Sequence, residues 1–193
     1  MFYVAPAPRE VLEPELHDEL SRLPDGSAIK KESHRLTLIY LLEGRSERQI
    51  ALSMQEGQHT VHYRIKWLYE KFKAEGRLAL LSVVFIRALV ARGLYLVSPS
   101  VQEELLRLPD GSALRAQQTR TTLLYLLCGM RIKEIAKAMD REPETIHTHI
   151  KRLHKMFDVE SNPDMLFMIF SRAIKASSKH TISSMVVAME QVA

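Results

Sequence analysis

The chain has few of the residues that cross-link small folds or interrupt them with loops. Its 193 residues include one cysteine, seven glycines and eight prolines, and aromatic residues make up 7%. A single cysteine, Cys128, excludes an intrachain disulfide and suits a reducing compartment. Cys128 falls at the end of a predicted helix, where we expect a small buried thiol.

Long apolar runs are also scarce. The first residues include Pro6 and Pro8 and no apolar run behind a basic start, so we expect no signal peptide. The most apolar stretch, 78–97, is interrupted by Arg87 and Arg92, and its counterpart later in the chain, 163–178, is amphipathic. This pattern predicts a buried helix rather than a membrane span, and we expect a cytoplasmic protein.

Motifs of common catalytic chemistry are missing as well. The chain has no glycine-rich phosphate loop, no nucleophile elbow and no pair of carboxylates on a shared apolar face. Three histidines (His147, His149 and His154) fall in one predicted helix. Zinc ligands on a helix usually lie at i and i+4, and the spacing of these histidines does not bring them together in that way. We therefore expect no enzyme, no cofactor and no metal.

What the chain does contain is one stretch written twice. The segment 23–28 (Leu-Pro-Asp-Gly-Ser-Ala) returns at 108–113, an offset of 85 residues, and the same offset pairs Tyr40-Leu41-Leu42 with Tyr125-Leu126-Leu127. It also pairs Phe72 with Phe157. A repeat of this length is a duplicated domain rather than a short solenoid unit.

The offset predicts the organisation of the chain. We expect an N-terminal arm over 1–13, a first repeat over 14–97, a second repeat over 98–176 and a tail over 177–193 whose apolar spacing is near-helical. Each repeat is small, so we expect the two to share an interface that buries enough apolar surface.

The repeats have the pattern of an all-α fold. Leucine-rich helices are expected over 34–43 and 118–128, each closed by a glycine, Gly44 or Gly129, in the left-handed C-cap position. Short helices follow, the first opened by a capping box of Ser46 and Gln49. Further helices are expected over 60–73 and 145–157, and Pro143 suits a first helical position. No run alternates with the period of a strand.

The predicted helix 145–157 has one apolar side and one basic side. Ile146, Ile150, Leu153 and Phe157 form a narrow stripe at helical spacing and should face the core. The opposite side carries Glu144, Thr148, Lys151, Arg152 and Lys155, flanked by His147 and His154. The preceding short helix turns Ile135 and Ala136 inward and Lys133 and Lys137 outward.

A short helix, a tight turn and a second helix with a basic outer face form the pattern of a helix-turn-helix, whose second helix enters the major groove of DNA. Lysine and arginine on such a face neutralise phosphates or contact guanine edges. A simple solvated helix face is the alternative. The net charge of +4 favours a polyanionic partner only weakly.

The corresponding helix of the first repeat is less suited to DNA. With Val61, Ile65, Leu68 and Phe72 inward, its outer side carries His59, Tyr63, Lys66, Trp67 and Glu70. Glu70 opposes phosphate, and exposed aromatic residues are enriched at protein–protein interfaces. Arg64 and Lys66 are the candidate DNA contacts in this repeat. Tyr63 and Trp67 either form a protein-binding surface or pack over a neighbouring domain.

These residues resemble the LuxR-type (GerE-like) DNA-binding domain. The resemblance covers about 60 residues of the second repeat, through 129–136 (Gly-Met-Arg-Ile-Lys-Glu-Ile-Ala), 145–149 (Thr-Ile-His-Thr-His) and 155–159 (Lys-Met-Phe-Asp-Val), and is fainter in the first. It implies a four-helix domain whose third helix contacts the major groove and whose fourth commonly dimerises. It also implies DNA-contacting roles for Lys133, His147 and His149.

The chain departs from the family pattern in the turn, where Arg141 and Glu56 replace an apolar residue. The domain of sigma factors that recognises the −35 element shares the helix pattern.

The sequence thus predicts a bacterial transcription regulator that binds double-stranded DNA, alone or as a homodimer, mainly through its second repeat. Its candidate DNA contacts are His147, Thr148, Lys151, Arg152, Lys155, Lys133, Lys137, His149, Arg64 and Lys66. Two linked repeats would suit major grooves about 34 Å apart. The alternative is an adaptor or antagonist that keeps the fold and binds another regulatory protein through Tyr63 and Trp67.

Overall fold

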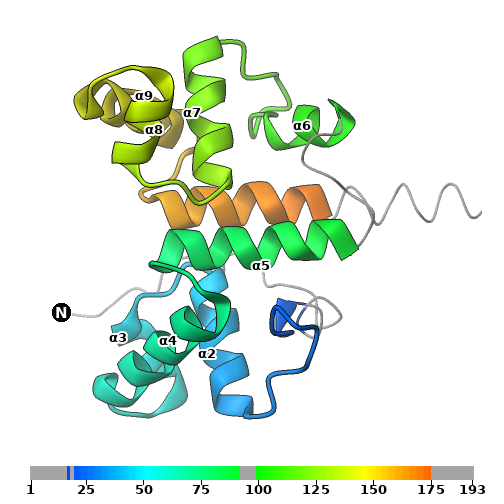
Figure 1. Ribbon diagram of the computed structural model, residues 1–193, viewed down its shortest axis with the longest axis vertical. Helices are drawn as coiled ribbons and strands as arrows, with labels where there is room; N and C mark the ends of the chain where they lie inside the picture. Colours follow the sequence, from blue (N-terminus) through cyan, green and yellow to red (C-terminus); the bar gives the residue numbers. More distant parts are fainter. Residues whose placement is uncertain (1–16, 18–19, 92–98, 175–193) are drawn as a thin grey trace, which may run out of the picture. The chain divides into compact units, whose positions relative to one another are not determined.

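The structure is a computed structural model, and it describes residues 17, 20–91 and 99–174. The described residues form helices joined by short turns (Figure 1). Their β interactions are two isolated antiparallel bridges, Arg22 with Ala28 and Arg107 with Ala113. The prediction of an all-α fold is confirmed. The expected N-terminal arm, 1–13, and C-terminal tail, 177–193, lie outside the described residues.

The 85-residue offset seen in the sequence also relates the helices. Their bounds are α2 Glu32–Leu42, α3 Glu47–Met54, α4 Gln58–Phe72 and α5 Arg77–Ala91, then α6 Pro99–Leu105, α7 Gln117–Leu127, α8 Ile132–Met139, α9 Pro143–Phe157 and a helical segment over 162–174. In this order α2, α3, α4 and α5 begin 85 residues before α7, α8, α9 and the helix of 162–174. The duplication therefore extends to the local structure.

The turns between these helices follow from particular residues. Gly44 and Gly129 take positive φ angles of 85° and 79° directly after the C-caps of α2 and α7, a conformation that glycine adopts without steric cost. At the start of α3, the Ser46 side chain accepts from the Gln49 N–H, and the Gln49 side chain accepts from the Ser46 N–H at 2.8 Å. Pro143 opens α9. These predictions are confirmed.

Contacts divide the chain into two compact units, Met1–Arg77 and Leu78–Ala193, which we call unit 1 and unit 2. In unit 1, α2 packs against α3 and α4, and α3 packs against α4. Val61, Ile65, Leu68 and Phe72 of α4 are buried in this core, as the spacing predicts.

A buried threonine links helices in both units in the same way. In unit 1 the Thr37 hydroxyl donates to the Ser33 carbonyl at 2.7 Å and contacts the Met54 sulfur at 3.6 Å. In unit 2 Thr122 makes the equivalent contacts with Gln118 and Met139, at 2.9 and 3.6 Å. The hydroxyl proton is thus satisfied within its own helix, while the side chain packs on the helix that follows.

Unit 2 combines α7, α8 and α9 with α5 and the helix of 162–174. The rings of Phe85 on α5 and Phe170 stack with centroids 5.0 Å apart, and the two helices run side by side (Figure 1). At the end of α7, a Cβ on Gly129 would lie 3.2 Å from the Ala79 Cα, so α5 also approaches this turn closely. The sequence boundary at 97–98 assigned α5 to the first repeat, whereas these contacts group it with unit 2.

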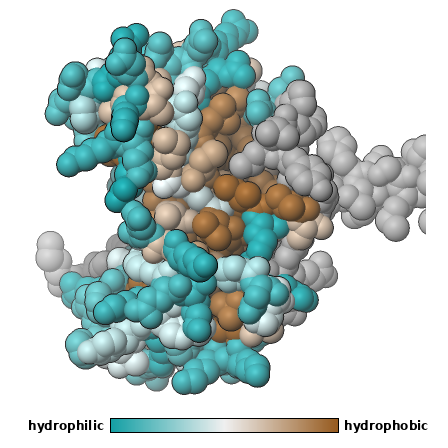
Figure 2. Space-filling model, viewed as in Figure 1, coloured by the Kyte–Doolittle hydropathy of each residue, from teal (hydrophilic) through white to brown (hydrophobic). Residues whose placement is uncertain are grey.

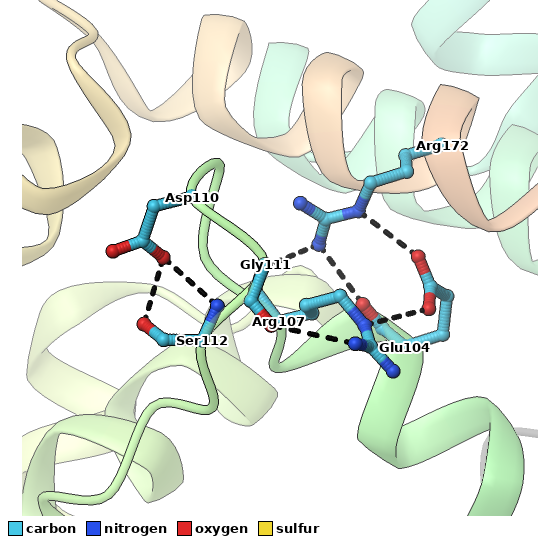
Figure 3. Close-up of polar contacts among 6 residues, drawn as sticks. All are labelled: Glu104, Arg107, Asp110, Gly111, Ser112 and Arg172. Carbon is cyan, nitrogen blue, oxygen red and sulfur yellow. Dashed lines mark hydrogen bonds and ion pairs between the residues drawn. The ribbon is translucent and has the colours of Figure 1, made fainter.

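A guanidinium holds α6 to the helix of 162–174 (Figure 3). Arg172 donates to the backbone carbonyls of Glu104 and Arg107 at the end of α6 and pairs with the Glu104 carboxylate at 3.2 Å. The other carboxylate oxygen of Glu104 accepts from Arg107 at 3.0 Å. One side chain thus joins the last turn of α6 and the residues that follow it to another helix.

The turn after α6 is closed by its own side chains. Asp110 accepts hydrogen bonds from the Ser112 N–H at 2.9 Å and the Ser112 hydroxyl at 2.7 Å (Figure 3). These bonds favour the carboxylate and lower the pKa of Asp110. Asp25 and Ser27 make the same pair of bonds in unit 1, at 2.9 and 2.6 Å.

The apolar helix α5 is buried along one side. Leu80, Leu81, Val84, Phe85 and Leu89 are inaccessible to solvent, while Val83 and Val90 are partly exposed. Hydrophobic residues reach the visible surface over α5 and the neighbouring helix (Figure 2). Among the helices that the structure describes, none is both long enough and apolar enough to cross a bilayer.

The prediction of a buried thiol was wrong. Cys128 is the C-cap residue of α7, and its side chain is exposed. Leu126 and Leu127, the residues just before it, are buried. The prediction assumed that the helical spacing continues to Cys128. The helix ends at Leu127, however, and the chain turns at Cys128 towards Gly129.

Candidate nucleic-acid interface

The two sides of α9 differ as the sequence predicts. Ile146, Ile150, Leu153 and Phe157 are buried against the rest of unit 2, where α9 packs on both α7 and α8. The opposite side is exposed and carries His147, Thr148, Lys151, Arg152 and Lys155. We call this the basic face of α9.

The cations of the basic face are not paired with carboxylates of the described residues. Within the described part of the chain, Lys151, Arg152 and Lys155 make no ion pair. Glu144 lies on the same side in the first turn of α9, where a carboxylate complements the helix dipole. Unpaired cations on one side of a helix leave a positive potential directed at solvent, which suits a polyanion.

The preceding helix α8 adds two more cations. Ile135 and Ala136 are buried, and Lys133 and Lys137 are exposed on the outer side. At its start, the Glu134 carboxylate accepts from the Arg131 N–H at 2.8 Å and from the Arg131 guanidinium. These bonds lower the pKa of Glu134, so this carboxylate remains ionised and engaged with Arg131.

The turn between α8 and α9 is short and regular. Asp140, the C-cap of α8, has a φ of 51° and its N–H bonds back to α8, and Pro143 then begins α9. The equivalent residue of unit 1, Gln55, has a φ of 54°. Hydrophilic residues dominate the visible surface over α8 and α9 (Figure 2).

The threonine of the basic face is only partly available to a ligand. The Thr148 hydroxyl donates to the Glu144 carbonyl of its own helix at 3.0 Å. Its proton is therefore engaged, and its oxygen remains as an acceptor. Contacts to an exocyclic amine of a base suit such an oxygen, whereas contacts to phosphate need a donor.

The three histidines of α9 face different surroundings. His149 lies between α9 and α7, with its Nδ1 3.3 Å from the Thr119 hydroxyl, and burial together with the charge of Arg152 lowers its pKa. The Nε2 of His154 lies 2.8 Å from the Asn162 side-chain oxygen. His147 is exposed. Across the described ranges, no three histidine, cysteine or acidic residues are arranged to hold a metal ion.

The equivalent helix of unit 1 presents its candidates differently. Arg64 is largely buried and pairs with Glu56 at 2.6 Å, so its charge is engaged, whereas Lys66 is exposed. Tyr63 is exposed, but the Trp67 ring packs edge-on against His34 of α2 at 4.5 Å. Burial and the nearby Arg64 lower the pKa of His34.

One exposed side chain of unit 1 was overlooked in the sequence. Leu52 of α3 is 72% exposed, the highest value among the large hydrophobic residues described. The 85-residue offset makes Leu52 equivalent to Lys137, which was predicted to face outward. Comparing the repeats position by position would therefore have identified Leu52 as exposed.

Comparison of the chain with protein-family models, curated proteins and solved structures finds no match.

Proposed function

We propose that the chain binds double-stranded DNA through the basic face of α9 and acts as a transcription regulator in the cytoplasm. The observation that carries this proposal is the set of cations Lys151, Arg152 and Lys155, exposed together on one side of a helix and without ion pairs among the described residues. Polyanion binding releases condensed counterions from DNA, and each phosphate contact contributes to that release.

The geometry around α9 agrees with this role. A tight turn joins it to α8, whose Lys133 and Lys137 face outward and suit contacts to the phosphate backbone beside the groove. In this proposal α9 enters the major groove, with Lys151, Arg152 and Lys155 as the main contacts. The resemblance to LuxR-type domains points the same way.

Two candidate contacts have other roles in the structure. His149 contacts Thr119 of α7 and helps to position α9, and Arg64 is paired with Glu56. We propose that neither contacts DNA directly. Lys66 remains a candidate for weaker contacts by unit 1.

The test is a salt titration of binding to a labelled duplex, followed by fluorescence anisotropy. We expect the logarithm of affinity to fall steeply with the logarithm of salt concentration. Lys155→Ala should weaken binding to all duplexes alike and reduce the salt slope by about one. Lys151→Ala should act in the same direction.

A charge-matched control separates a specific face from general basicity. Arg120 is exposed on α7 and is also a cation, so Arg120→Ala removes the same charge elsewhere. If Arg120→Ala and Lys155→Ala reduce affinity and slope equally, α9 is not the binding face. If neither the wild type nor any variant binds duplex DNA at low salt, the proposed function is wrong.

A further inference from the structure

A second exposed surface lies on α3 and α4 of unit 1. Leu52 on α3 is 72% exposed and Tyr63 on α4 is 60% exposed, while the other exposed large hydrophobic residues described reach at most 43%. The two helices pack against each other, and we group these two side chains with the exposed cations Arg48 and Lys66 as the Leu52–Tyr63 surface.

The duplication shows that the fold does not require these apolar groups. At the equivalent positions of unit 2, Leu52 is matched by Lys137 and Tyr63 by Thr148, both polar and exposed. The same helix pair therefore tolerates polar side chains there. Large exposed apolar residues that the fold does not need are typical of protein-binding surfaces.

Tyr63 is held in an outward position by its neighbours. The His59 ring packs edge-on against it with centroids 4.6 Å apart, and the His62 ring lies 6.5 Å from it, also edge-on. His62 is itself placed 3.4 Å from the Glu47 carboxylate. An aromatic side chain supported in this way loses little conformational entropy when a partner covers it.

Two exposed cations lie one helical turn from the apolar residues. Arg48 precedes Leu52 by one turn of α3, and Lys66 follows Tyr63 by one turn of α4, and neither has an ion-pair partner within the described residues. Glu70, which makes no ion pair within the described residues, lies a further turn along α4. Glu47 and Glu56 are engaged with His62 and Arg64.

The start of α4 adds to this positive potential. Its N-cap, Gly57, provides no side-chain hydrogen bond, and its first turn has no acidic residue. The equivalent turn of α9 contains Glu144. The positive end of the α4 dipole is therefore not offset by a carboxylate of its own, so a partner's carboxylate would be favoured there.

We propose that the Leu52–Tyr63 surface binds an acidic amphipathic segment of another protein. Apolar side chains of the partner cover Leu52 and Tyr63, and its carboxylates meet Arg48, Lys66 and the start of α4. This inference does not depend on DNA binding by α9, because it concerns other residues in the other unit. The sequence suggested Tyr63 and Trp67 as the protein-binding residues. Because Trp67 packs against His34, Leu52 takes its place beside Tyr63 in this proposal.

The probe is a synthetic peptide of about 18 residues, or five helical turns, with leucines at i, i+4, i+7 and i+11, glutamates on the opposite side and alanines at the other positions. We expect the full chain to bind it in fluorescence anisotropy, and added salt to weaken binding. A matched peptide with lysines in place of the glutamates should bind at least about tenfold more weakly, a difference of about 1.4 kcal/mol.

The variants remove the two apolar side chains without adding charge. Leu52→Gln and Tyr63→Thr should each weaken binding of the acidic peptide, and the double variant should weaken it about tenfold, or about 1.4 kcal/mol. Both positions are exposed, so helical content measured by circular dichroism should not change. Val83→Gln alters a partly exposed apolar residue of α5 and should leave peptide affinity unchanged.

Several results would overturn this proposal. Equal affinity for the acidic and basic peptides, unchanged affinity in either single variant, or no binding of the acidic peptide at about millimolar concentration would each do so. Weaker duplex binding by Leu52→Gln and Tyr63→Thr would assign the surface to DNA instead. If sedimentation shows that the wild type self-associates and the double variant does not, the surface binds a second copy of the chain instead.

Discussion

Phe85 and Phe170 stack on each other with their ring planes 9° from parallel, and they are the same residue of the two repeats. Phe85 lies on α5 and Phe170 on the helix of 162–174, which begin 85 residues apart. The helices α5 and 162–174 thus associate within unit 2 as two copies of one element. Phe167 adds an edge-on contact with Phe85 at 6.3 Å.

We expect Phe170→Ala to reduce the free energy of unfolding by about 3–5 kcal/mol, because it leaves a cavity at a fully buried position. Urea unfolding followed by circular dichroism measures this loss. Val83→Ala, at a partly exposed position of α5, is the control and should change stability by less than about 1 kcal/mol. Similar losses in the two variants would show that the aromatic stack contributes little.

Gly129 and Gly111 allow the cost of close packing to be separated from that of a positive φ. Both have φ near 80°, but a Cβ on Gly129 meets Ala79 and Ser82 at 3.2 Å, whereas one on Gly111 meets nothing within 4 Å. Gly111→Ala should cost about 1–2 kcal/mol from its left-handed conformation alone. Gly129→Ala should cost a further 1 kcal/mol or more, roughly the penalty of overpacking.

Thermal or urea unfolding of these two variants, compared with the wild type, provides the measurement. Equal destabilisation would mean that α5 moves away from the α7 turn without cost.

The lowered pKa of His149 predicts that acid destabilises unit 2. Because the folded state binds the proton less tightly than the unfolded chain does, His149 favours folding above the ordinary pKa of 6.5, and this contribution is lost as the pH falls below that value. His34 acts in the same direction in unit 1. Comparing free energies of unfolding at pH 7.5 and 5.5 tests this.

His149→Asn keeps a polar group beside Thr119 but removes the titration, so the difference between the two pH values should shrink. The carboxylates with lowered pKa, such as Glu134, titrate below this range and do not interfere. An identical pH dependence in His149→Asn and the wild type would contradict the assignment.

Cys128 should react with a thiol reagent in the folded protein, because its side chain is exposed. Nearby groups that partly desolvate the thiol raise its pKa, so the reaction rate should still be rising at pH 9, the ordinary pKa of the group. Absorbance assays with an aromatic disulfide across pH 7–10 measure the rate. A thiol that reacts only in denaturant would be buried after all.

The periodicity of apolar residues in the sequence predicts much of this fold correctly. The stripe from Ile146 to Phe157 predicts which side of α9 is buried, and therefore which side presents Lys151 and Lys155. Glycine at positions 44 and 129 predicts the helix ends because few other residues take a positive φ there. These features depend on the spacing of nearby residues and on local backbone preferences, and both can be inferred from a single sequence.

Contacts between distant residues were harder to predict. Periodicity places Trp67 on the outer side of α4, but His34 of α2 lies close enough to pack against its ring. The pairing of Arg64 with Glu56 depends likewise on how α4 follows its turn. The sequence shows α5 to be apolar without showing that Phe170, 85 residues later, is its partner.

The stacked rings of Phe85 and Phe170 belong to a single polypeptide, so dilution does not separate the two helices that carry them. Two separate chains that met through such a contact would dissociate at low concentration, whereas here the linking residues keep the local concentration of one helix near the other fixed. The association of α5 with residues 162–174 should therefore be independent of how many molecules a cell contains.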